Sequence, residues 1–439
     1  MLDLWNIRRT SVLLDALLAF YRRTARFASA ITFLGFAVVF GVAPITNGAA
    51  TRLTGSLSTD WRLWQDSSYH RTQTYNAFRA TLTIPTKGSS FIALRTNMRW
   101  RKDLDNSPSA SSQLYVYETY LQFSELVRGT NLFVGRQFSS SNLGSALMDG
   151  ARLQYRYKSK AQLDIFGGGQ VQSGRPSTIG SIDSSGIFGA RLSGRPYAAT
   201  SIGAEWMLRR SGSQPSYQAV GFDVTHRRGV AQLFAQAVFN LQYARISTLK
   251  ARLSVAPTKW YLSAEVISRE PYVPANSVFS VVSFERYRFG RLGIRRQIIR
   301  SIAADASVNL SFTGSTKTWH TTLGISDGNC ALGWYHQTGR GTTNNGFYGS
   351  ASVDVSPRWS VFAYADLSQY RIQEMETVSS DSYSASLGLS WKFASQLSAQ
   401  VEGQYLKNAL RKNDYRLLLR LTKGFALKFN HSESSGVKP

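Results

Sequence analysis

The sequence predicts an all-β fold, a single closed antiparallel β-barrel of about 22 strands (roughly 20–24) that spans a membrane. Three observations predict it. Apolar and polar residues alternate through most of the 439 residues. Short turns also alternate regularly with longer polar segments along the chain. The composition is 43% hydrophobic and 13% aromatic but only 18% charged, which suits a wall between lipid and water.

Residues 1–50 differ from the remainder of the chain. An arginine-rich stretch is followed by an apolar run at 30–42 and by small residues at 47–50. This order predicts a secretory signal peptide over 1–50, cleaved after Ala49 or Ala50. An uncleaved anchor helix is the alternative, although its apolar core is short for crossing a bilayer. No linker interrupts residues 51–439, which we therefore interpret as one barrel.

The alternation has a period of two residues. Between 302 and 312 the even-numbered positions are apolar, whereas Asp305, Ser307, Asn309 and Ser311 are polar. Residues 91–101 and 383–391 alternate in the same way. A period of two predicts strands with one apolar face, because successive side chains of a strand point to opposite sides.

The connections between these strands are expected to differ at the two ends of the barrel. Short turns are predicted near 87–88, 127–129, 158–159, 195–196, 228–229, 257–258, 300–301, 327–328, 357–358 and 394–395. Longer polar loops are predicted at 103–112, 139–150, 172–184, 339–345, 371–381 and 407–413. Either 139–150 or 172–184 is a candidate to fold inward. Closure requires the last strand to pair with the first, so that no backbone edge remains in lipid.

Three segments carry a resemblance to a known class of proteins: Tyr-Glu-Thr-Tyr-Leu-Gln-Phe at 117–123, Leu-Phe-Val-Gly-Arg-Gln at 132–137 and Asp-Gly-Ala-Arg-Leu at 149–153. They are similar to porin-type outer-membrane barrels of Gram-negative bacteria, and the resemblance covers 51–430. It implies an outer-membrane location, short periplasmic turns, long extracellular loops, and contact with lipid and lipopolysaccharide. The final strand resembles the aromatic-ended strand that the insertion machinery reads, except for the polar tail at 431–439.

The inward-facing positions are where a wide barrel would carry its function. Basic residues in the inward phase predict a pore lining made of Arg79, Arg95, Arg99, Arg101, Arg152, Arg156, Arg191, Lys250, Arg252 and Arg295. Acidic residues share this phase, namely Glu118, Asp164, Glu205, Glu265, Asp305, Asp366 and Glu402. With a formal net charge of +25, the chain is expected to prefer anions weakly. Alternatively, the basic residues only anchor and solubilise the protein, many of them against lipopolysaccharide phosphates.

The resemblance therefore implies a porin-like channel for passive diffusion of small solutes, among them anions. Two alternatives stay open. The barrel could be a sheath that houses a multihaem cytochrome, with every haem supplied by that partner because the chain has no C-x-x-C-H motif. It could also be a structural or assembly barrel of the outer membrane. A homo-oligomer is compatible with each interpretation.

Other classes of function fit the sequence poorly. The five histidines have no metal-ligand spacing, the single Cys330 has no disulfide partner, and no Ser/His/Asp arrangement stands out. We therefore expect no enzyme activity, no catalytic residue, no metal and no cofactor. The basic residues are dispersed over alternating strands instead of forming a patch, which argues against nucleic acid as a partner.

Overall fold

The computed structural model describes residues 50–65, 70–86, 88–105, 112–158, 160–171, 177–270, 285–339, 342–372, 379–408 and 413–429. The predicted signal peptide lies outside these residues except for Ala50, as do parts of several predicted loops. No helix in the described part of the chain is long and apolar enough to cross a membrane.

The described residues form 22 strands. They are β1 (Thr51–Gln65), β2 (His70–Pro85), β3 (Phe91–Asp103), β4 (Gln113–Ser124), β5 (Thr130–Ser141), β6 (Gly144–Tyr157), β7 (Ala161–Gln170), β8 (Gly186–Tyr197), β9 (Thr200–Ser211), β10 (Gln214–Arg228), β11 (Ala231–Asn240), β12 (Arg245–Val255), β13 (Trp260–Arg269), β14 (Tyr287–Gln297), β15 (Ala303–Thr313), β16 (Thr316–Ser326), β17 (Cys330–Gly339), β18 (Thr342–Ser356), β19 (Trp359–Ile372), β20 (Ser379–Ala394), β21 (Leu397–Lys407) and β22 (Asp414–Phe429).

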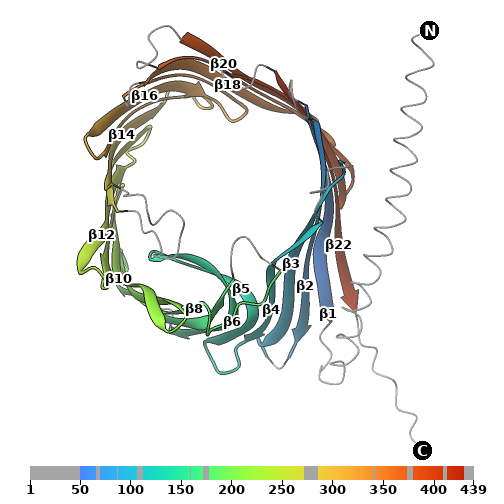
Figure 1. The fold of residues 1–439 in the computed structure, drawn as a ribbon, viewed down its shortest axis with the longest axis vertical. Helices are drawn as coiled ribbons and strands as arrows, with labels where there is room; N and C mark the ends of the chain where they lie inside the picture. Colours follow the sequence, from blue (N-terminus) through green and yellow to red (C-terminus); the bar gives the residue numbers. More distant parts are fainter. Residues whose placement is uncertain are drawn as a thin grey trace, which may run out of the picture.

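The strands form one closed antiparallel barrel (Figure 1). Each strand pairs with its neighbours in chain order, and β1 pairs with β22 from Thr51 opposite Phe429 to Gln65 opposite Tyr415. The prediction of a closed barrel of about 22 strands is confirmed. Closure gives the first and last strands a hydrogen-bonding partner, so that neither presents an open edge to lipid.

The two ends of the barrel differ, but less sharply than the sequence suggested. Connections from an even-numbered to an odd-numbered strand are short, and nine of the ten predicted turns fall on them. The prediction at 195–196 was wrong, because β8 continues to Tyr197 and the turn is at 198–199. At the opposite end, the connections 104–112 and 270–286 are long, whereas 212–213 and 314–315 are two-residue turns.

The turn between β16 and β17 shows how a short connection is fixed locally. The Asp327 carboxylate accepts hydrogen bonds from the backbone N–H groups of Asn329 at 2.7 Å and Cys330 at 2.6 Å. These two bonds hold the pKa of the Asp327 carboxyl below its ordinary value. An aspartate that binds the backbone two and three residues ahead favours a tight turn.

The outward face is apolar. Phe347 of β18 pairs with Leu367 of β19, and their side chains are 63% and 51% exposed. Beside the 357–358 turn, the rings of Trp359 and Trp391 stack with centroids 4.6 Å apart. Exposed aliphatic residues with aromatic residues near a strand end are the exterior that a surrounding bilayer requires.

Candidate functional site in the barrel lumen

The β5–β6 hairpin leaves the barrel wall and folds into the interior of the ring (Figure 1). Strand β4 pairs with β3 as far as Gln113, but its pairing with β5 stops at Thr119 opposite Arg136. Gly135, at the departure point, has a φ of 126°. Residues other than glycine rarely adopt this φ. A Cβ at position 135 would also lie 3.0 Å from the Tyr120 Cα.

Residues 139–150 were predicted as a loop that could fold inward. The inward position is observed, but the loop prediction was wrong, because 139–141 end β5 and 144–150 begin β6. The Ser, Gly and Asn content of this stretch suggested a loop. The two strands nevertheless pair with each other from Thr130 opposite Tyr155 to Ser141 opposite Gly144, so the hairpin keeps its backbone hydrogen bonds after leaving β4.

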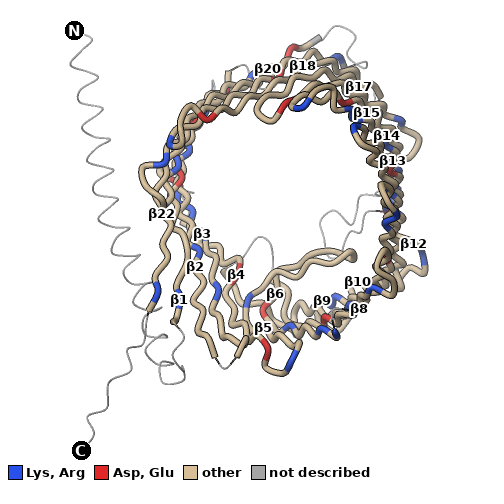
Figure 2. Tube along the Cα trace, turned by 180° about the vertical axis from the view of Figure 1, so that it is seen from behind, with Lys and Arg blue, Asp and Glu red and all other residues tan. Residues whose placement is uncertain are grey.

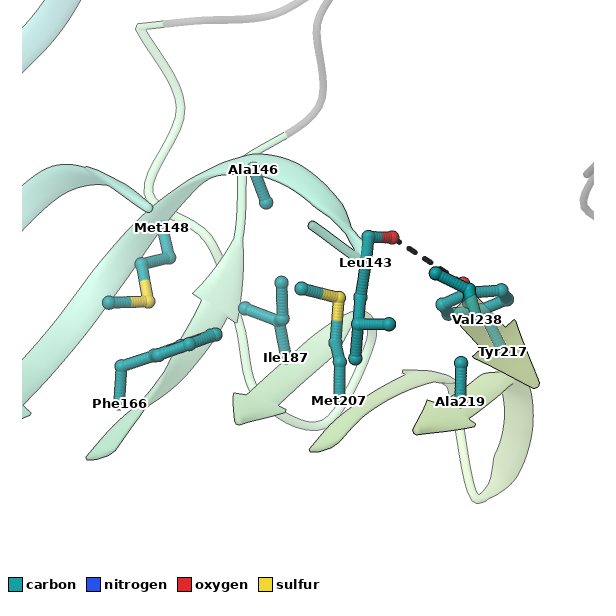
Figure 3. Packing of buried hydrophobic residues seen from close by; sticks show 9 residues of the cluster. All are labelled: Leu143, Ala146, Met148, Phe166, Ile187, Met207, Tyr217, Ala219 and Val238. Atoms are coloured by element: carbon teal, nitrogen blue, oxygen red, sulfur yellow. Dashed lines mark hydrogen bonds between the residues drawn. The ribbon is translucent and has the colours of Figure 1, made fainter. Parts of the chain in front are cut away.

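An apolar cluster holds the hairpin against the wall (Figure 3). Leu143, Ala146 and Met148 of the hairpin pack on residues of five successive strands: Phe166, Ile187, Met207, Tyr217, Ala219 and Val238. Met148 and Ile187 are fully buried. Full burial of a side chain of this size stabilises the arrangement by about 1.5–3 kcal/mol.

Polar contacts fix the tip of the hairpin. The Asn142 side-chain amide donates to the Asp223 carboxylate at 2.7 Å, and its backbone N–H donates to Glu205 at 3.3 Å. Arg191 bridges the same two carboxylates, at 2.9 Å from Glu205 and 2.7 Å from Asp223. Because the tip lies inside the ring, these contacts identify the face of β8, β9 and β10 that points into the lumen.

The opposite face of the hairpin carries a second ion pair. Arg136 donates to Asp149 at 2.7 and 2.6 Å and to the carbonyl oxygen of Thr178 at 2.6 Å. Asp149 also accepts from the backbone N–H of Gly180 at 2.6 Å. The 177–180 stretch of the other candidate loop, 172–184, is thus bound to the hairpin, while 172–176 lie outside the described residues.

The strand register extends the lumen face in both directions, because directly paired residues share a face. From Arg191 it runs through Asp164 and Gln154 to β6, and from Asp223 through Gln236 to Lys250. All the basic residues predicted for the pore lining lie on this face: Arg79, Arg95, Arg99, Arg101, Arg152, Arg156, Arg191, Lys250, Arg252 and Arg295.

These residues have different surroundings. Arg152 forms an ion pair with Asp164, Arg191 holds Glu205 and Asp223, and Lys250 lies 3.0 Å from Glu265. Their charges are locally balanced.

A second group of arginines lines β1–β3, and we call it the arginine wall: Arg62, Arg79, Arg95, Arg99 and Arg101. Within the described residues, none of these side chains makes an ion pair. Of the carboxylates nearby, Asp60 pairs with Arg420 at 2.8 Å and Asp103 with Arg71 at 2.6 Å, whereas Glu118 lies opposite Asn97 on the same face and makes no ion pair among the described residues. Figure 2 shows the basic positions along these strands.

An aromatic ring organises part of the arginine wall. The guanidinium groups of Arg62 and Arg99 lie 4.5 and 4.1 Å from the centroid of the Tyr75 ring. A ring attracts cations at its face and holds them without neutralising them. The predictions omitted Arg62 and Arg420, although both lie in the same two-residue phase, and that phase was the signal that could have found them.

The wall of β17–β19 has a different chemistry. Tyr335 and Tyr364 donate hydrogen bonds to the two oxygens of Asp366, at 3.1 and 3.5 Å. Of the two histidines on neighbouring strands, His320 faces the lumen and contacts Asn309 at 3.2 Å, whereas His336 points outward. No group of three or more His, Cys, Asp or Glu side chains in the described ranges could hold a metal ion.

Comparison with known proteins gives weak similarities only. No family model matches the chain, and no curated protein sequence matches it. Among solved structures, Acinetobacter baumannii OccAB3 has a TM-score of 0.44 at 9% identity over 86% of this chain and 99% of its own. Pseudomonas aeruginosa OpdQ gives 0.42 at 9% identity over 86% and 99%, and the outer membrane protein opdK of Pseudomonas aeruginosa gives 0.40 at 10% over 87% and 100%. Similarities of this size carry no argument about function.

Proposed function

We propose that the chain is an outer-membrane channel for passive diffusion of small solutes and that its lumen prefers anions weakly. One observation carries the proposal: the arginine wall presents five lumen-facing guanidinium groups that form no ion pair within the described residues. Fixed cationic groups along a pore raise the local concentration of anions and lower that of cations.

The dimensions of the barrel support a channel. A barrel of eight strands fills with its own side chains, whereas barrels of this strand number enclose a channel or a plugged lumen. Here the β5–β6 hairpin is folded flat against β7–β11, which narrows the interior from one side and leaves the arginine wall uncovered by it. The narrowing brings passing ions closer to the fixed charges and so strengthens selectivity.

Export to the outer membrane would require the segment before β1. We propose that residues 1–50 are a signal peptide removed during export. Mass spectrometry of the protein isolated from outer membranes should give a mature N-terminus near Ala49 or Ala50. An intact N-terminus in the purified barrel would contradict cleavage.

Selectivity is tested by single-channel recording in planar bilayers with a KCl gradient. The wild-type reversal potential should indicate a preference for chloride. The double variant Arg95→Glu plus Arg99→Glu should move that potential toward potassium, because it replaces two positive charges of the arginine wall by negative ones.

The matched control makes the same charge change outside the lumen. Arg300→Glu plus Arg358→Glu alters two exposed positions in short turns and should leave the reversal potential close to the wild-type value. Equal shifts in the two double variants, or no shift in either, would remove the arginine wall from the conduction path. A purified barrel that conducts only after a haem protein is stripped from it would replace the channel by the cytochrome sheath.

A further inference from the structure

We propose that the lumen also contains a binding site for organic ammonium ions, formed by Tyr335, Tyr348, Tyr364 and Asp366 and called here the tyrosine cluster. This proposal rests on the proposed function, because solutes reach the tyrosine cluster through the lumen. The site lies on β17, β18 and β19, which are separated along the sheet from the arginine wall of β1–β3 by β20–β22.

The cluster contains a carboxylate without a cationic partner. Asp366 makes no ion pair in the described part of the chain, and tyrosine hydroxyls occupy both of its oxygens. The register places no lysine or arginine at the lumen-facing positions of β16–β19. The lumen-facing positions of β16–β19 thus carry carboxylates and no lysine or arginine, which favours a cation at the tyrosine cluster.

The rings lie flat on the wall. Gly346 is paired with Tyr335 and Gly333 is paired with Tyr348, and a Cβ at either glycine would collide with the ring opposite. The missing side chains let both rings cover the backbone with one face, which leaves the other face directed to the lumen. Their centroids are 6.5 Å apart. An aromatic face is electronegative and attracts ammonium groups.

Charge distinguishes an ammonium ion from a neutral sugar as the ligand. The hydroxyl groups of Tyr335 and Tyr364 already donate to Asp366, so the cluster offers their acceptor oxygens, the hydroxyl of Tyr348, the ring faces and the negative charge of Asp366. The N–H groups of an organic ammonium ion can donate to the acceptor oxygens, and its positive charge is attracted by Asp366 and by the ring faces. Tyr364 is 41% exposed, which keeps the cluster accessible from the lumen.

The test uses spermidine as the probe, in two measurements on the full barrel. Isothermal titration with detergent-solubilised protein measures binding without any need for conduction, and single-channel recording measures block of the ionic current. Asp366→Asn, which keeps the shape and removes the charge, should weaken both binding and block by about tenfold. Tyr364→Leu removes one exposed ring and should weaken both by about fivefold.

The control is Asp354→Asn, on the same face of β18 and near the short-turn end, where no tyrosine of the cluster lies. It should bind spermidine as the wild type does. Conduction with no binding or block by spermidine, or equal losses for Asp354→Asn and Asp366→Asn, would overturn the ammonium site while leaving the channel intact. Competition by a neutral maltooligosaccharide at equal strength would overturn it as well. Binding without any current would support the site and contradict the channel instead.

Discussion

The lumen-facing arginines of β6–β8 and those of β1–β3 occupy equivalent positions in the two-residue repeat but have different surroundings. Beneath the hairpin tip, Arg191 holds Glu205 and Asp223, and the Glu205 side chain is only 2% exposed, while Arg152 of β6 forms an ion pair with Asp164 of β7. On the arginine wall, Arg79 and Arg95 have no ion pair among the described residues. Arginines in the same phase of the strand pattern thus have two different kinds of surroundings.

The difference follows from what covers each region. Where the β5–β6 hairpin lies on the wall, Glu205 and Asp223 are 2% and 12% exposed, and such carboxylates need a cationic partner because burial of a charge without one is strongly unfavourable. Where the wall faces the open lumen, water and salt screen each charge. We infer that Arg191 helps to hold the hairpin in place, whereas the arginine wall is free for the role in ion selectivity proposed above.

The largest effect is expected from Arg191→Leu. This substitution leaves Glu205 and Asp223 without their cation beneath the hairpin, which should destabilise its docking by about 3–5 kcal/mol. Limited proteolysis at the hairpin tip should become faster, and the single-channel current should become noisier. Arg95→Leu on the arginine wall is the matched control and should change neither. Equal protease resistance in both variants would contradict a structural role for the covered arginine.

Met148→Ala should loosen the hairpin by about 2–3 kcal/mol, because it empties a fully buried position between the hairpin and the wall. A hairpin that detaches more often should raise the mean single-channel conductance. Phe138→Ala tests the other side of the same hairpin, where the ring is 50% exposed, and should leave the melting temperature unchanged. The assignment of the two faces fails if Phe138→Ala destabilises the protein more.

Gly135→Ala tests the departure of the hairpin from β4. Alanine adopts a φ of 126° only with strain, so a loss of about 1–3 kcal/mol is expected at the bend. The measurement is thermal unfolding of the purified barrel in detergent. Gly403→Ala is a suitable control, because nothing lies within 4 Å of a Cβ at that position. Similar melting temperatures for both variants would exclude Gly135 as a requirement of the inward fold.

Arg420→Ala should have the smallest effect. Arg420 pairs with Asp60 across the closure of the barrel, but its side chain is 51% exposed to the lumen. An ion pair so open to water contributes less than about 1 kcal/mol. Urea unfolding should therefore give a midpoint close to that of the wild type. A loss as large as that of Arg191→Leu would show that exposure is not what separates the two regions.

The orientation of several candidate pore-lining residues could be predicted because it depends on neighbours in the chain. Whether a side chain faces lumen or lipid follows from its place in a two-residue repeat, so the phase of Arg95, Arg152 and Lys250 could be assigned without a structure. The same phase also carries an indication of the covered region. Ile187, Met207 and Val238 are apolar residues at lumen-facing positions, which indicates that something covers the wall there.

The amino-acid sequence by itself determined most strands, their approximate number, the apolar exterior and the phase of the basic residues, because alternation and turn chemistry act over a few neighbouring residues. Only the tertiary structure decided the rest. Arg136 has the outward phase of β5, yet the bend of the hairpin brings it over the lumen to Asp149. The bend depends on contacts between β6 and strands as distant as β11. The alternation of apolar and polar residues along one strand does not indicate such contacts.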